Sequence, residues 1–128
     1  MPSSKIAKAI LWLLVLQFAL GMLANMYVEL PQDKPWEVFH QFGFVTLHAV
    51  NGVLLLVLGA IFMVQALKAH ERQRGGVVGF LSMVVAFVCG ELFVFSGNDV
   101  YSFGMALSFL GAFVTYAQVV FSAKPKKW

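Results

Sequence analysis

One run of the sequence limits the fold more than any other. Residues 44–67, FVTLHAVNGVLLLVLGAIFMVQAL, form a stretch of 24 residues without Asp, Glu, Lys or Arg. About 20 helical residues, each rising about 1.5 Å, cross a hydrocarbon core of about 30 Å, so this run predicts a membrane-spanning helix. The run also contains His48 and Asn51, which lie one helical turn apart. Unpaired polar groups are costly in hydrocarbon, so both side chains are expected to face protein, cofactor or water.

The rest of the chain repeats this pattern. Of its 128 residues, 60% are hydrophobic and only 12% are charged, whereas a soluble domain has about 25% charged residues. Apolar runs separated by polar or proline-containing segments predict four helices, at about 6–28, 36–69, 77–95 and 101–121. We therefore expect an all-α protein, an integral membrane four-helix bundle with up-down-up-down order, in which residues 1–128 form one domain.

The positions of the cations predict the orientation of this bundle in the membrane. Eight of the nine Lys and Arg residues precede the first run, follow the second or end the chain, and only Lys34 lies on the other side. The positive-inside rule then places both termini in the cytoplasm, as expected for a multi-pass protein of the inner or plasma membrane. The net charge of +3 comes without a long basic run, so nucleic acid is not an expected partner. The single cysteine, Cys89, excludes an internal disulfide.

Small residues recur at helical spacing in every predicted span. Because lipid gives helices no hydrophobic reason to associate, membrane helices pack where small side chains let backbones approach. The predicted packing positions are Gly21, Gly52, Gly59, Ser82, Ala86, Gly90 and Gly111. A uniform apolar surface can face lipid or another subunit, so a homo-oligomer and a larger membrane complex both stay open.

The predicted topology gathers polar and sulfur-containing side chains in the outer half of the bundle. His48 lies towards the midplane and His40 near the outer surface, eight residues earlier on the same predicted helix. The predicted cofactor-binding residues are His48, Asn51, Glu91, Asn25 and His40. The predicted ligands of a metal or haem iron are His48, Met22 and Met105.

His48 has two interpretations. A charged imidazole is costly near the middle of a membrane, so a neutral ring with one donor and one acceptor is expected. That ring can hydrogen-bond across helices and stabilise their packing, or it can bind a cofactor through the same atoms. Substitution of His48 distinguishes the two, because only the second interpretation predicts the loss of a bound chromophore, metal or quinone.

Parts of the sequence resemble known membrane proteins. The segments LWLLVLQFALGMLANMYVELP, LHAVNG and YSFGMA are similar to a group of small bacterial four-helix membrane proteins of unassigned function. The segment His48-Ala49-Val50-Asn51-Gly52 resembles the haem-ligating helices of cytochrome b561-like bundles, a resemblance that implies electron transfer between b haem and quinone. Those bundles take histidines from at least two helices, whereas here all three histidines belong to the second predicted helix or its ends. A haem would therefore need Met22 or Met105, or His48 of a second subunit, as its other ligand.

Three functions remain open at this point. The first is a redox or cofactor-binding bundle in which His48 ligates b-type haem or hydrogen-bonds a quinone, with Glu91 as a proton donor. The second is a homo-oligomeric channel or carrier for a small solute or ion. The third is an accessory subunit of a larger membrane complex. Hydrolytic chemistry has little support, because no phosphate-binding loop, zinc-protease motif or Ser-His-Asp spacing is present.

Overall fold

The computed structural model describes residues 2–31 and 33–122, which form five helices and, within those ranges, no strand. The helices are α1 (Pro2–Tyr27), α2 (Glu37–Gln41), α3 (Gly43–Lys68), α4 (Gln73–Ser96) and α5 (Asp99–Phe121). All except the short α2 are long and apolar enough to cross a membrane. The fold is therefore helical, and its four long helices indicate a multi-pass membrane protein.

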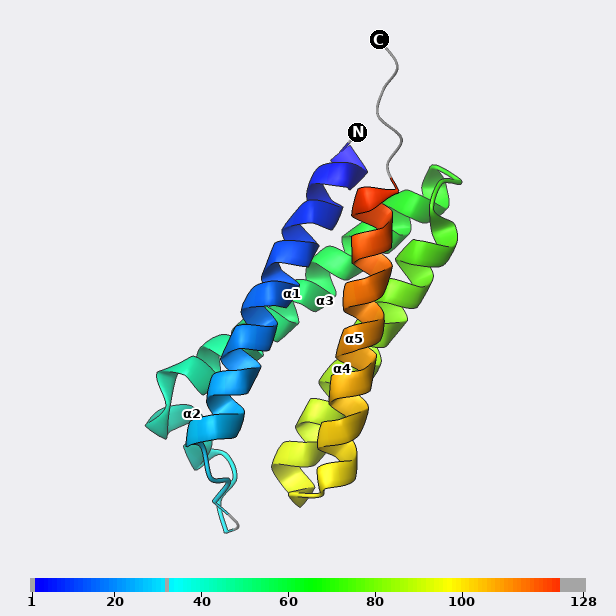
Figure 1. Ribbon diagram of the computed structural model, residues 1–128. Helices are drawn as coiled ribbons and strands as arrows, with labels where there is room; N and C mark the ends of the chain where they lie inside the picture. The colour runs from blue at the N-terminus through cyan, green and yellow to red at the C-terminus, as the bar shows by residue number, and fades with distance from the viewer. Residues whose placement is uncertain (1, 32, 123–128) are drawn as a thin grey trace.

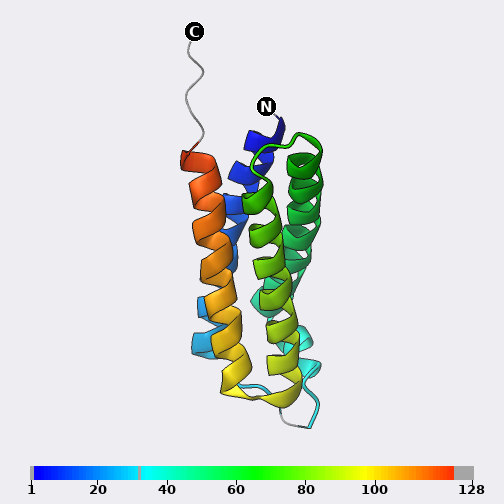
Figure 2. The same ribbon diagram turned by 90° about the vertical axis from the view of Figure 1, so that its right-hand side faces the viewer.

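The four long helices form a ring in which each contacts two neighbours. Helix α1 packs against α3 and α5, and α4 packs against the same two helices. Figure 1 shows that successive long helices run in alternating directions, so that α1 begins at the end of the bundle where α5 finishes. Figure 2 shows α4 and α5 side by side along their lengths and joined by a short turn.

The second predicted helix, 36–69, is interrupted, which corrects the expectation of one continuous helix. Phe42 has an extended backbone (φ −131°, ψ 107°) and separates α2 from α3. Glycine at position 43 favours a helix boundary because it has a low helix propensity. The Thr46 hydroxyl donates to the Phe39 carbonyl oxygen at 2.7 Å and satisfies an acceptor that the interruption leaves free.

Helix α4 begins at Gln73, four residues before the predicted start, so part of the segment expected to be a loop is helical. Gly75 and Gly76 precede the predicted span 77–95, but both belong to α4 and lie where it approaches its neighbours closely. A Cβ atom on Gly75 would lie 2.8 Å from Cγ2 of Val119, and one on Gly76 would lie 3.3 Å from the main-chain Cα of Met63. These two glycines therefore permit helix packing, which their sequence context does not reveal.

Fully buried side chains are distributed unevenly along the bundle. Buried residues extend on α1 only as far as Leu20 and on α4 only as far as Met83, and they begin on α3 at Asn51 and on α5 at Ala112. On all four long helices, the buried residues therefore lie towards the same end of the molecule, which we call the basic half. It holds the described cations Lys5, Lys8, Lys68, Arg72 and Arg74.

The opposite part, the α2 half, consists of residues 21–50 and 84–111. Figure 1 shows α1 and α3 diverging from α4 and α5 towards this end. Ring contacts bridge the two pairs here: Trp36 meets Phe95 edge-on at 4.7 Å, and Phe18 stacks on Phe109 at 6.1 Å near the boundary with the basic half. The α2 half therefore has aromatic contacts between the helix pairs, and among its described residues the only buried side chain is Val38 on α2.

The predicted small-residue packing is confirmed at the glycines. Gly59 faces Met83, Phe80 and Tyr116, and Gly52 faces Gln17 and Phe87. The remaining pairs are Gly21 with His48, Gly90 with Met105, and Gly111 with Ser82. Gly104, which was not predicted, faces the Cys89 sulfur across α4 and α5.

Candidate functional site

A hydrogen-bonded cluster of three side chains, Gln17, His48 and Asn51, joins α1 to α3 at the boundary between the two halves. Asn51 Nδ2 donates to the Leu13 carbonyl oxygen at 3.0 Å and to Gln17 Oε1 at 2.7 Å. Gln17 Nε2 lies 3.3 Å from His48 Nε2. Asn51 is only 4% exposed, so the structure places this amide among protein groups, as the sequence predicted.

The hydrogen bonds determine where the imidazole proton lies. The Leu13 carbonyl oxygen only accepts, so the atom of Asn51 that contacts it must be the amide nitrogen. The same nitrogen then donates to the oxygen of Gln17, which directs the Gln17 amide nitrogen towards His48. An amide NH2 group only donates, so His48 Nε2 accepts and the proton of the neutral ring lies on Nδ1.

That Nδ1 atom is buried and has no hydrogen-bond partner among the described residues. The main-chain carbonyl oxygen of Gln17 lies close enough to the imidazole to act as a weak acceptor, although it does not meet hydrogen-bond geometry at Nδ1. Gly21 lies beside this edge of the ring, where a Cβ atom would be 3.2 Å from Cε1 and 3.7 Å from Nδ1. A buried donor without an acceptor costs about 1–3 kcal/mol, which a bound acceptor would recover.

The structure brings together only two of the five predicted cofactor-binding residues. His48 and Asn51 belong to one cluster, whereas Asn25, His40 and Glu91 are exposed. Within the described ranges, none of these three side chains hydrogen-bonds to the cluster. These three residues were predicted to lie in the same half of the bundle as the cluster, but they do not share a hydrogen bond with it.

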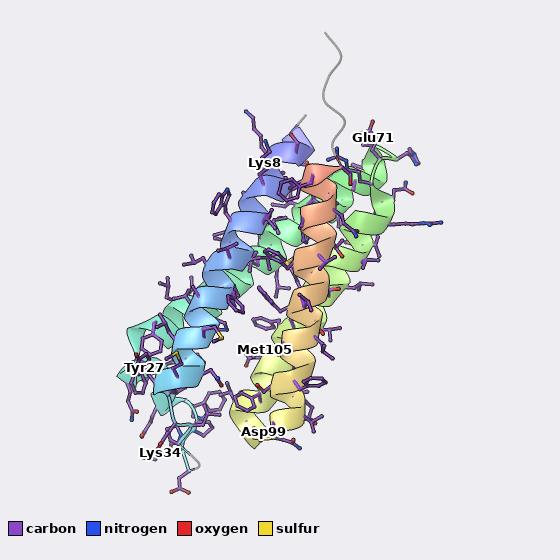
Figure 3. All side chains as sticks on the ribbon, viewed as in Figure 1. Lys8, Tyr27, Lys34, Glu71, Asp99 and Met105 are labelled. Carbon is purple, nitrogen blue, oxygen red and sulfur yellow. The ribbon has the colours of Figure 1, made fainter. Side chains whose placement is uncertain are left out.

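The predicted methionine ligands do not converge on His48 either. Met22 is 45% exposed on α1, and the Met105 sulfur packs across α5 towards Gly90 of α4. Figure 3 shows Met105 on the α4–α5 side of the molecule. Axial ligation of haem normally uses the lone pair of a histidine nitrogen, and Nε2 of His48 already accepts from Gln17. The residues around His48 therefore do not fit a haem.

No group of three or more His, Cys, Asp or Glu side chains that could hold a metal ion occurs in the described part of the chain. Two open pockets lie away from His48, one at each end of the bundle. The pocket at the α2 end is lined by Tyr27, Glu29, Leu30, Pro31, Gln41 and Phe42. The one at the basic end is lined by Arg72, Gly75, Thr115, Gln118, Val119 and Ser122.

Gln17 is the member of the cluster that was missing from the predicted site. The signal for it was present, because Gln17 and Gly21 lie one turn apart on the polar side of the first predicted helix. His48 and Gly52 have the same polar-and-glycine spacing on their own helix, and each glycine faces the polar residue of the other pair. Whether Gln17 or Asn25 contacts His48 depends on how α1 is positioned along α3. The spacing of residues within one helix gives no information on that position.

Comparisons with known proteins add no assignment to this geometry. No model of a protein family matches the chain, and no curated protein or solved structure is significantly similar to it. The function is therefore argued from the residues alone.

Proposed function

We propose that this protein is a plasma-membrane bundle with both termini in the cytoplasm that binds a quinone-type cofactor at His48. One observation carries the cofactor assignment: the cluster directs a proton to His48 Nδ1, a buried donor without an acceptor. A quinone carbonyl oxygen is an uncharged acceptor that reaches such a donor from the lipid phase. The α1–α3 pair would supply the donor, and the Gly21 backbone, which packs closely against the same edge of the ring, would have to move apart from it to admit the carbonyl group.

The alternatives receive less support from the same contacts. A haem requires the lone pair that Gln17 already occupies. A channel lined by the cluster requires its amides to face a pathway, whereas Asn51 is 4% exposed and bonded to α1. The quinone hypothesis uses the one atom of the cluster that is both buried and without a hydrogen-bond partner among the described residues.

The residues of the cluster would each have a separate role. Asn51, anchored on the Leu13 carbonyl, orients the Gln17 amide, and Gln17 keeps the proton on Nδ1 of His48. His48 then donates one hydrogen bond and fixes the position of the bound carbonyl group. When bound, a quinone supplies two-electron, two-proton redox chemistry.

Quinone retention tests this proposal. The protein is purified from membranes in mild detergent, and its lipid extract is analysed for quinones by mass spectrometry. Wild-type protein is expected to retain quinone above the level of a membrane-protein control, and His48→Leu to lose it because the donor is gone. His40→Gln is the matched control, since His40 is exposed on α2 and should not affect retention.

Folding of the variants is checked separately. His48→Gln should keep the helix content and cost about 1 kcal/mol, the usual contribution of one interhelical hydrogen bond. Wild-type protein without quinone, or equal quinone in His48→Leu and wild type, would contradict the cofactor assignment.

The proposed orientation has an independent test. Three of the cations that motivate it, Lys124, Lys126 and Lys127, lie outside the described residues. In a Cys89→Ala background, a membrane-impermeant maleimide applied to intact cells should label Asp33→Cys and spare Ser122→Cys. Efficient external labelling at position 122 would refute the assignment of the C-terminus to the cytoplasm.

A further inference from the structure

A second site is suggested at the opposite end of the molecule, where α4 begins beside the end of α5. An open pocket of about 290 Å³ lies between the two helices. Its lining contains one guanidinium group, from Arg72, and the polar side chains of Thr115, Gln118 and Ser122. The quinone proposal does not use any of these residues.

Arg72 is a cation available to a ligand. Among the described residues, the only ion pair joins Lys34 to Glu37, so Arg72, a half-buried residue, has no carboxylate partner there. Figure 3 shows the neighbouring acidic residue, Glu71, at the outer tip of the α3–α4 connection. A partly buried guanidinium presents a fork of N–H donors that matches the oxygens of a phosphate group.

The pocket contains further hydrogen-bonding groups. Thr115 donates its hydroxyl proton to the Gly111 carbonyl oxygen at 2.7 Å, which leaves the Thr115 oxygen as an acceptor. Ser122 and Gln118 have no side-chain hydrogen bond within the described residues, so the hydroxyl and the amide are free to donate. Residue 72 is also the N-cap of α4 and makes no side-chain cap, whereas Ser122 is the C-cap of α5, so the opposite partial charges of these two helix ends offset each other and the positive charge of the pocket comes from Arg72.

We propose that this pocket binds a phosphate group, as presented by the headgroup of an anionic phospholipid in the membrane leaflet at the basic end. The position agrees with the chemistry, because Lys68 and Arg74 lie at the same end and raise the local concentration of anions. Two of the donors come from α5 and one from the start of α4, so binding would join the ends of these two helices. This inference does not depend on the quinone proposal.

Native mass spectrometry of the purified protein with phosphatidylglycerol, and in parallel with phosphatidylcholine, measures the lipid site. Arg72→Gln is expected to reduce phosphatidylglycerol retention roughly ten- to hundredfold, the loss of one charge-assisted hydrogen-bonded contact. Arg74→Gln removes the same charge from an exposed position outside the pocket and is expected to retain the lipid. Gln118→Leu provides a second variant, on the α5 side, if Arg72→Gln loses helix content.

A second arm titrates inorganic phosphate alone and follows it by calorimetry. Loss of phosphatidylglycerol in Arg72→Gln without heat from inorganic phosphate supports a lipid headgroup, and Arg72-dependent heat supports a soluble phosphate in the same pocket. Equal behaviour of Arg72→Gln and Arg74→Gln in both arms overturns the proposal. Equal retention of phosphatidylcholine and phosphatidylglycerol by wild type, with no Arg72-dependent phosphate heat, overturns it as well.

Discussion

The two halves of the bundle are held together in different ways. In the basic half, all four long helices contribute to one buried cluster that includes Ile10, Phe62 and Tyr116, each 0% exposed. In the α2 half, the closest backbone contacts join the helices in pairs, α1 to α3 beside His48 and α4 to α5 through Gly90 and Gly104, and ring contacts such as Trp36 with Phe95 bridge the two pairs. The polar cluster of Gln17, His48 and Asn51 lies at the boundary.

This difference indicates where the chain can bind something without losing its fold. A close-packed core tolerates neither added nor removed volume, because its side chains already fill the space between helices. Helices joined in pairs can change their separation at less cost, since fewer buried contacts must be broken. The proposed cofactor site lies beside the core. Its donor, His48, is held in place by Gln17 and Asn51, whereas the helices of the α2 half around it can change their separation.

The largest expected effect comes from removing core volume. Phe62→Ala should lower the free energy of unfolding by about 3 kcal/mol, because it leaves a cavity where the ring packs against Tyr116 at 5.6 Å. Phe103→Ala, on α5 in the α2 half, removes a ring that is 65% exposed and should change stability by less than about 0.5 kcal/mol. Denaturant titration in mixed micelles measures both, and equal losses would contradict the proposed difference between the halves.

Adding volume to the core should be the next most harmful change. A Cβ atom on Gly79 would lie 2.7 Å from Cε2 of Tyr116, part of a rigid ring that cannot bend away. Gly79→Val is therefore expected to cost roughly 1–3 kcal/mol. Gly43→Ala is the matched control, because a Cβ there has nothing within 4 Å. Melting in detergent compares the two, and an unchanged melting temperature for Gly79→Val would refute the close packing of α4 on α5.

The polar cluster should contribute less than the core. Asn51→Leu removes both hydrogen bonds to α1 and is expected to cost about 1 kcal/mol, as interhelical hydrogen bonds in membranes usually do. A double-mutant cycle with Gln17→Leu isolates their coupling. If the losses of stability of the two single variants are additive in the double variant, the two side chains do not interact. The assignment of the His48 tautomer, which depends on that interaction, would then lose its basis.

The smallest effect is expected where a second buried polar atom has no partner. Tyr116 Oη is buried in the basic half without a hydrogen bond to any described residue, against Gly59 and Gly79. Tyr116→Phe should therefore be neutral or stabilising, by less than about 1 kcal/mol. A loss of more than that amount would show that the hydroxyl has a partner and would make Tyr116, like His48, a candidate ligand-binding group.

Much of the helical architecture could be predicted from the sequence, because apolar runs of this length have few alternatives in a membrane. The glycine contacts were predictable because membrane helices pack where small side chains let their backbones approach. The interruption at Phe42 and the early start of α4 were not predicted. Gly43 has nothing within 4 Å of a Cβ position, so only its low helix propensity marks the break, whereas Gly75 and Gly76 make tertiary contacts with Val119 and Met63 that the local sequence does not contain. Of the polar cluster, the sequence singled out His48 and Asn51, which share a helix, whereas their partner Gln17 depends on how α1 is placed against α3.

The proposed site finally depends on the position of one proton. Solid-state ¹⁵N NMR of histidine-labelled protein in lipid bilayers observes it directly, and the His48 signals are assigned by their absence in His48→Gln. The cluster predicts a neutral ring with the proton on Nδ1 and an unprotonated Nε2 that accepts from Gln17. A proton on Nε2, or on both nitrogens at neutral pH, would contradict the hydrogen-bond order and with it the buried donor proposed to bind a quinone.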